Sequence, residues 1–429
     1  MSGKSFFALI SGFFLCIGTC SGQVPDKIYK NFIATPQLYQ YGNQTLLPVF
    51  TLNSGDRFQL SFDDLDANFK SYYYTYQLCD YNWQPVNLSP FDYIKGFTQN
   101  RLTTYRYSSI ALTRYTHYQA ILPERNAVPS RSGNYLVKVF IDGDTANIAF
   151  TRRLLVVDNK ATVNASITQL LGAQNFTTYQ KVRFTVTTND INAFNAAQQV
   201  KVVILQNNRW DNAQKDIAPT FIRGNVLDYT NDNIAQFAAG KEWRWLDLRS
   251  LRLQSDRIAK ADYGKTYTNM YVRPDVDKSS QRYLFYPDFD GAFNVMTYES
   301  INPFWQGDYA KVFFYFAPPN GIPFTNKQLY LSGQFTNYQY TPAYKMIYND
   351  STGLYEGNVF MKQGYYNYTY TLVNDNGEPD FSNPLEGNYW ETQNNYTILV
   401  YYKSFTDRND QLIGVGYINS RRDRPGLSF

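Results

Sequence analysis

Histidine is almost absent from this chain of 429 residues. His117 is the single histidine, so neither a histidine pair around a metal nor a two-histidine catalytic site can form within one chain. His117 would share a strand face with Tyr115, which favours a structural role over acid–base catalysis. The composition therefore predicts a protein that is not an enzyme and that uses no cofactor and no metal.

Long runs of one charge are also lacking. The formal net charge is +4, and no block or stripe of Lys and Arg occurs. Nucleic-acid-binding proteins need a basic surface of that kind to neutralise phosphates. The charge pattern thus predicts no nucleic-acid partner.

Cysteine is scarce, and two of the three cysteines lie in a short apolar stretch at the N-terminus. Lys4 precedes an apolar run at 6–17, which is shorter than the roughly 20 residues of a membrane span. The run predicts a signal peptide at 1–22, cleaved after Gly22, and hence export to the periplasm. The alternative is lipidation of Cys20. After cleavage only Cys79 remains, which excludes an internal disulfide.

Aromatic residues are abundant, with 39 Tyr and 31 Phe. Apolar residues alternate with polar ones at 135–141 and at 181–187, as in half-buried strands. Turn signals such as Asp142-Gly143 separate the apolar runs. The pattern predicts an all-β fold of tandem immunoglobulin-like β-sandwich domains.

Three domains are expected from where the strand runs stop and restart. They are an N-terminal β-sandwich at 23–158, a middle β domain at 159–310 and a C-terminal immunoglobulin-like β-sandwich at 311–429. A Tyr-rich alternating chain that ends in Phe429 could instead form an outer-membrane barrel. The Arg424-Pro425-Gly426 sequence speaks against a terminal membrane strand.

Carboxylates support the enzyme alternative, a hydrolase that uses Asp63, Asp64 and Asp288. A calcium loop counted from Asp288 would use Asp290 and Glu299 as ligands. Ala292 would then fill a ligand position and Phe293 the position that needs Gly, so no metal site is expected there.

Aromatic side chains are the remaining functional signal, because they bury a large area at low entropic cost. On strands about half of them must point into the core. The candidate partner-binding surface consists of Tyr72, Tyr74, Trp83, Phe91, Tyr93, Trp243, Trp245 and Arg249.

Several sequence blocks resemble the type IX secretion system plug protein family of the Bacteroidetes. They include YQLCDYNW at 76–83, NLSPFDYIKGF at 87–97, SGNYLVKV at 132–139, WRWLDLRSLR at 243–252 and DQLIGVGYIN at 410–419. The resemblance implies a periplasmic protein that binds and seals the periplasmic mouth of a large outer-membrane translocon barrel. Contact with the membrane would be indirect, through that barrel.

The third segment has a second resemblance, to a starch-binding-type immunoglobulin-like module. It rests on GQFTN at 333–337, GLYEG at 353–357 and KQGYYNYTY at 362–370. An envelope glycan-binding protein is therefore the alternative function. Asp144-Thr145-Ala146 and Asp350-Ser351-Thr352 also resemble the Bacteroidetes O-glycosylation acceptor, at Thr145 and Ser351.

Overall fold

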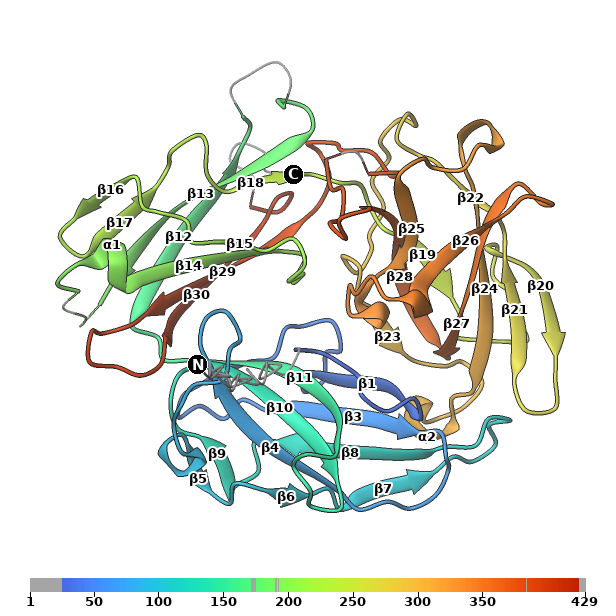
Figure 1. The fold of residues 1–429 in the computed structure, drawn as a ribbon, viewed down its shortest axis with the longest axis horizontal. Helices are drawn as coiled ribbons and strands as arrows, with labels where there is room; N and C mark the ends of the chain where they lie inside the picture. Colours follow the sequence, from blue (N-terminus) through green and yellow to red (C-terminus); the bar gives the residue numbers. More distant parts are fainter. Residues whose placement is uncertain (1–24, 171–174, 190, 192, 383, 424–429) are drawn as a thin grey trace, which may run out of the picture.

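The computed structural model describes residues 25–170, 175–189, 191, 193–382 and 384–423. The predicted signal peptide at 1–22, with Cys20, lies outside the described residues. Regular structure in this part is almost entirely β, which confirms the predicted all-β fold. Three β units lie around a common centre (Figure 1). No helix in the described ranges is long and apolar enough to cross a membrane.

The first unit, residues 25–158, is a β-sandwich. One sheet has the order β1-β3-β8-β7, and the other has the order β11-β10-β4-β6, with β2 paired to β11. Val137 and Val139 point from β10 into the core, as their period-2 spacing predicts. The elements are β1 (Ile33–Gln40), β2 (Val49–Thr51), β3 (Phe58–Asp64), β4 (Tyr72–Cys79), η1 (Pro90–Asp92), β5 (Ile94–Gly96), β6 (Asn100–Arg101), β7 (Thr104–Tyr107), β8 (Thr116–Leu122), β9 (Ala127–Pro129), β10 (Gly133–Ile141) and β11 (Ile148–Val157).

The second unit, residues 161–239 with 390–423, is also built from two sheets around one core. One has the order β12-β13-β17-β16, with β18 paired to β13, and the other has the order β15-β14-β29-β30. The latter continues into the first unit, because Val157 of β11 pairs with Leu412 of β30. The elements are β12 (Ala161–Thr168), β13 (Tyr179–Thr188), α1 (Ala196–Gln199), β14 (Val200–Gln206), β15 (Gln214–Lys215), β16 (Phe221–Arg223), β17 (Val226–Tyr229), β18 (Gln236–Ala238), β29 (Asn395–Tyr402) and β30 (Gln411–Asn419).

The third unit, residues 240–389, holds a sheet of the order β19-β28-β25-β26-β27-β24-β21-β20. Tyr366, Tyr368 and Tyr370 of its strand β28 fill much of the core. The elements are β19 (Arg244–Asp247), β20 (Ile258–Tyr263), β21 (Thr268–Val272), β22 (Asp275–Val276), β23 (Phe293–Val295), α2 (Pro303–Gln306), β24 (Tyr309–Ala317), η2 (Pro319–Gly321), β25 (Lys327–Ser332), η3 (Gln334–Thr336), η4 (Pro342–Tyr344), β26 (Lys345–Asn349), β27 (Leu354–Lys362) and β28 (Gly364–Asn374).

The sheets divide the chain differently from the predicted domains at 159–310 and 311–429. β29 and β30, at the C-terminal end, pair with β14 and belong to the second unit. β19 and β21 lie before residue 310, yet they pair with β28 and β24 of the third unit. Pairing follows whichever strand edges meet in space, which the order of strands along the chain does not reveal.

Candidate functional site

Strand β4 carries two residues of the candidate partner-binding surface, Tyr72 and Tyr74. Both are completely buried in the core of the first unit. The Tyr72 hydroxyl donates to Asp64 Oδ2 at 2.8 Å, and its ring packs edge-on against Phe62. The prediction that these two side chains contact a partner is wrong, because their strand face is the inward one.

Trp83, Tyr93 and Trp243 are buried as well, so the same correction applies to them. Tyr93 packs against Tyr135 inside the first unit. Trp83 and Trp243 serve a different purpose, since each lies at a junction between units and contacts a side chain from the second unit.

The accessible members of the predicted surface are Phe91, Trp245 and Arg249. Phe91, in η1, is 78% exposed, and Phe97, which directly follows β5, is 66% exposed. We call Phe91 and Phe97 the aromatic tip. Arg249 is half-buried and lies over the Tyr298 ring, 4.5 Å from its centre.

The junction between the first and second units centres on Arg153 and two tryptophans. The Arg153 guanidinium lies 4.9 Å from the Trp83 ring and 4.8 Å from the Trp210 ring, and it pairs with Asp26. Trp83 and Trp210 meet edge to face at 5.0 Å. Trp210 belongs to a loop of the second unit, residues 207–212, which we call the junction loop.

The same loop also reaches the third unit. Arg209 donates two hydrogen bonds to Asp211 and lies over the rings of Tyr338 and Phe381, 5.0 Å from each centre. The Tyr340 hydroxyl donates to Asp211 at 2.8 Å. One six-residue loop thus contacts both neighbouring units, through cation–π contacts and the hydrogen bond from Tyr340 to Asp211.

The junction between the first and third units is a buried polar cluster around Asp63. His117 Nδ1 lies 2.7 Å from Asp63 Oδ1, while Lys362 Nζ and the Tyr309 hydroxyl donate to Oδ2. Lys362 also donates to the Phe304 carbonyl at 2.6 Å and lies 4.2 Å from the centre of the Tyr115 ring.

The ionisation of this cluster follows from burial and from the Lys362 charge. Burial alone would raise the pKa of Asp63, but Lys362 and His117 outweigh it and hold that pKa below its usual value. Burial lowers the pKa of His117 despite the adjacent carboxylate, so its imidazole stays neutral near pH 7. The cluster therefore joins the first and third units through the ionised Asp63 carboxylate and the Lys362 ammonium.

The carboxylates of the hydrolase hypothesis are not brought together. Asp63 and Asp64 are consecutive on β3 and point to opposite faces: Asp63 faces the third unit, while Asp64 binds Lys70 and Tyr72. Asp288 lies elsewhere and accepts from the amides of Trp243 and Asp290.

The calcium-loop alternative fails on Glu299, whose carboxylate accepts from Ser250 and from the amides of Leu251 and Arg252. Across the described part of the chain, no group of three or more His, Cys, Asp or Glu side chains could hold a metal ion.

A cavity of about 950 Å³ lies where the three units meet. Its lining includes Arg152 and Arg153 from the first unit, Trp210 and Tyr417 from the second, and Asp288 and Asp290 from the third. Asn395 donates to Asp290 Oδ2, and Gln393 donates to the same oxygen at 3.3 Å. The wall of the cavity is therefore itself a set of contacts between units.

Sequence reasoning missed Arg153, Arg209 and Lys362, the cations at the three junctions. Arg153 lies within β11, and Lys362 is the last residue of β27. A charge inside an alternating apolar run is a weak signal of a buried pair, because its partner lies far away in the sequence. Asp63 and Lys362 are 299 residues apart.

The comparison with family models decides how the first unit is classified. Residues 33–158 match the model of the type 9 secretion system plug protein 1st domain. The match spans the first unit from β1 to the end of β11. It supports the plug-family resemblance and connects the chain with type IX secretion. The resemblance of the third segment to a starch-binding-type module stays a prediction.

One solved structure extends the likeness beyond the first unit. The crystal structure of a hypothetical protein from Parabacteroides merdae ATCC 43184 has a TM-score of 0.88 and 29% sequence identity. The alignment covers 92% of this chain and 100% of that one, so the arrangement of all three units is shared. No curated protein matches the chain.

Proposed function

We propose that this chain is a non-enzymatic periplasmic component of the type IX protein secretion system that binds and seals the periplasmic opening of the outer-membrane translocon. The observation that carries the proposal is the match of residues 33–158 to the plug protein 1st domain. The partner is a large outer-membrane barrel, and the chain touches the membrane only through it.

The junctions between units support this role. A body that closes a wide pore must keep its shape when one side of it is pushed, and flexible units would pay an ordering cost on binding. Here each pair of units is joined by buried polar or cation–π contacts, at Arg153, at Arg209 and at Lys362. The three units therefore present one preformed surface.

The aromatic tip is the proposed docking element of the first unit. Phe91 and Phe97 are large, exposed apolar side chains in the segment that contains η1 and β5. Exposed aromatics of this kind anchor protein interfaces, where they fill pockets of the partner. Trp245 and Arg249 of the third unit offer a second, half-buried contact region.

Co-purification from envelope membranes tests the proposal. The tagged mature chain should retain a large outer-membrane β-barrel, identified by mass. Deletion of the chain should make the outer membrane permeable to solutes that it normally excludes. Phe91→Ala with Phe97→Ala should reduce the recovery of that barrel about tenfold or more, a loss of roughly 1.4 kcal/mol or more.

The matched control is Phe405→Ala, since Phe405 is 70% exposed on the second unit. It should leave recovery unchanged. The proposal is wrong if no outer-membrane barrel is retained and deletion leaves permeability unchanged.

A further inference from the structure

Strand β1 is an edge strand that borders the cavity of about 950 Å³ where the three units meet. Among the described strands only β3 pairs with it, and its residues Leu38 and Gln40 line the cavity. In an antiparallel ladder, residues whose backbone groups bond the partner strand alternate with residues whose groups point away from it. The register of the ladder therefore decides what β1 presents to the cavity.

The register leaves backbone groups of Leu38 and Gln40 without a partner. The Tyr41 N–H donates to the Arg57 carbonyl at 2.9 Å in the same ladder, so Leu38 and Gln40 are the residues whose N–H and C=O point away from β3. The Gln40 carbonyl accepts from the Asn43 N–H at 2.9 Å. Within the described ranges, no group bonds the Leu38 N–H, the Leu38 carbonyl or the Gln40 N–H. These three groups favour an added strand.

Carboxamide side chains in the wall of the same cavity already bind peptide groups of the chain itself. Gln44 donates to the Val295 carbonyl at 3.1 Å and accepts from the Val295 N–H at 2.8 Å, as a neighbouring strand would. Gln334 accepts from the Phe293 N–H at 3.2 Å. Two further carboxamides of the lining make no hydrogen bond within the described part of the chain, and their polar atoms are not enclosed: those of Gln37 and Asn337.

The charges of the lining are largely compensated, which favours an uncharged ligand. Arg153 pairs with Asp26, and Arg152 donates to the Pro36 carbonyl at 2.7 Å. Burial raises the pKa of Asp290 to about 8, so this carboxyl is neutral near pH 7. The volume lies at the upper end of the roughly 300–1,000 Å³ typical of ligand sites, which suits a segment of several residues.

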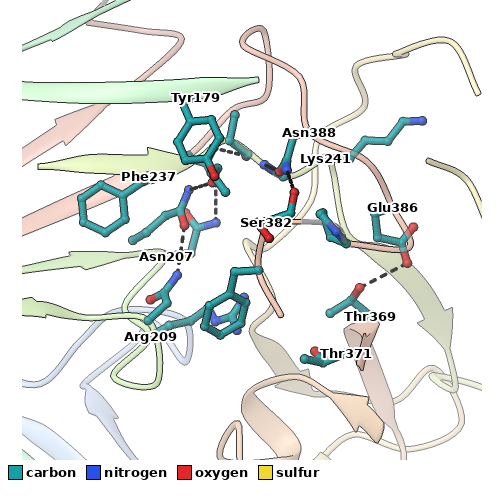
Figure 2. Close-up of a pocket in the computed structure, with 18 of the residues that line it drawn as sticks. Tyr179, Asn207, Arg209, Phe237, Lys241, Thr369, Thr371, Ser382, Glu386 and Asn388 are labelled. Atoms are coloured by element: carbon teal, nitrogen blue, oxygen red, sulfur yellow. Dashed lines mark hydrogen bonds between the residues drawn. The ribbon is translucent and has the colours of Figure 1, made fainter. Parts of the chain in front are cut away.

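A smaller cavity, of about 240 Å³, lies between the second and third units and does not offer such an edge. Figure 2 shows Asn207 on one side of it and Thr369 on the other. Gln206 Nε2 donates to the Ala238 carbonyl at 3.0 Å, so a side-chain amide already occupies a carbonyl of β18. Of the two cavities, the central one is therefore the one in which a peptide strand can pair.

We infer that the central cavity binds an extended, uncharged segment of another, unfolded polypeptide, which adds to β1 as a further strand. The N–H groups of Leu38 and Gln40 donate to its carbonyls, and the Leu38 carbonyl accepts from one of its N–H groups. Because the three units surround this edge, a folded partner cannot place a strand of its own sheet against it, whereas an unfolded segment can enter. This inference is independent of the proposed docking to a translocon.

Titration of the full mature chain with capped peptides tests the inference. The probe is a pentapeptide of alternating threonine and valine. The same peptide N-methylated at three consecutive residues has no complete strand edge, and peptides with lysine or glutamate in place of threonine test the effect of charge. The uncharged probe should bind at millimolar concentration or below. Amide hydrogen exchange, followed by NMR, should slow about fivefold or more at Leu38 and Gln40 when the probe is bound.

Gln40→Pro removes an N–H that β3 does not use, so the strand should persist while the probe binds about tenfold or more weakly. Gln40→Ala keeps that N–H and should lose less affinity than Gln40→Pro. Phe405→Ala, outside the cavity, should bind as the wild type does. A thermal melt shows whether Gln40→Pro is folded, and if it is not, the exchange at Leu38 in the wild type decides.

The inference is overturned if the uncharged probe does not bind, if the N-methylated peptide binds equally well, or if a charged peptide binds better. Unchanged exchange at Leu38 and Gln40 with the probe bound would also overturn it. Exchange at Leu38 that slows with protein concentration alone would place a second copy of this chain on the edge and contradict the inference. Recovery of the translocon by these variants is a separate readout.

Discussion

At the scale of residues, buried ion pairs join the units of this molecule. Asp63 and Lys362 are each about 1% exposed, and they come from different units. Removing one partner of such a pair leaves the other charge buried without compensation, which costs far more than losing a surface pair.

We therefore expect Lys362→Met to reduce the free energy of unfolding by about 3–5 kcal/mol. The matched control is Lys160→Met, because Lys160 and Asp158 form an exposed pair whose loss should cost about 0–1 kcal/mol. Chemical denaturation of both variants measures the difference. Equal losses in the two variants would contradict the role of Lys362 as a junction residue.

Glu242 makes the stability of the folded chain depend on pH. Its Oε1 accepts from Tyr283 at 2.6 Å and from the Gln393 amide at 3.2 Å, while its buried Oε2 has no partner in the described ranges. Burial raises the pKa of Glu242 from 4.5 to about 7. The folded chain holds this proton more tightly than the unfolded chain does. The stability that protonated Glu242 contributes is therefore fully present below pH 4.5 and is lost as the pH rises to about 7.

Glu242→Gln should remove this part of the pH dependence. Relative to the wild type, the variant should gain up to about 3 kcal/mol of stability on going from pH 4.5 to pH 8, since one pKa unit is worth about 1.4 kcal/mol. Denaturation at several pH values measures the two slopes. Parallel curves would mean that Glu242 is ionised in the folded protein.

At the scale of elements, close packing of strands depends on two glycines of β30. A Cβ on Gly416 would lie 2.7 Å from Val163 Cβ, and one on Gly414 would lie 2.7 Å from the Ala161 carbonyl oxygen. β12 therefore approaches β30 more closely than any side chain on these positions allows. The GVG sequence at 414–416 serves packing between the two sheets of the second unit.

Gly416→Ala should cost about 1–3 kcal/mol by overpacking, although alanine suits a strand better than glycine does. Gly55→Ala is the control, since a Cβ there meets nothing within 4 Å. Its effect should stay within about 0.5 kcal/mol. Thermal melts distinguish the two, and a neutral Gly416→Ala would show that β12 moves aside.

At the scale of the whole molecule, the chain closes a ring of three units in which the second unit is completed last. Tyr396, Ile398 and Val400 of β29 supply part of the second core, although the third unit is inserted before them in the sequence. A fragment of residues 159–310 lacks β29 and β30 and ends within β24, so it contains no complete core.

We expect residues 25–158 expressed alone to fold, because the core of the first unit is formed entirely by its own residues. The fragment 159–310 should stay unfolded or aggregate, since it exposes the apolar face of β14 and a free strand edge. Dispersion of amide NMR signals measures both. A well-folded 159–310 fragment would contradict the division of the chain into units given above.

The all-β fold and most of the first unit could be predicted from the sequence, because period-2 alternation and turn residues act over a few neighbours. The runs at 135–141 and 181–187 both form strands, and strand β11 ends at Val157, one residue before the predicted boundary. The absence of a second histidine is likewise evident from the sequence alone.

Tertiary structure alone decided which aromatics are buried and which strands share a core. Tyr74 and Phe91 are both aromatic, yet one is fully buried and the other is 78% exposed. Pairs such as Asp63 with Lys362 join positions hundreds of residues apart, and their energy depends on burial that only the packed units create. Local pattern therefore determined the strands, whereas the long-range meeting of strand edges and buried charges determined the ring.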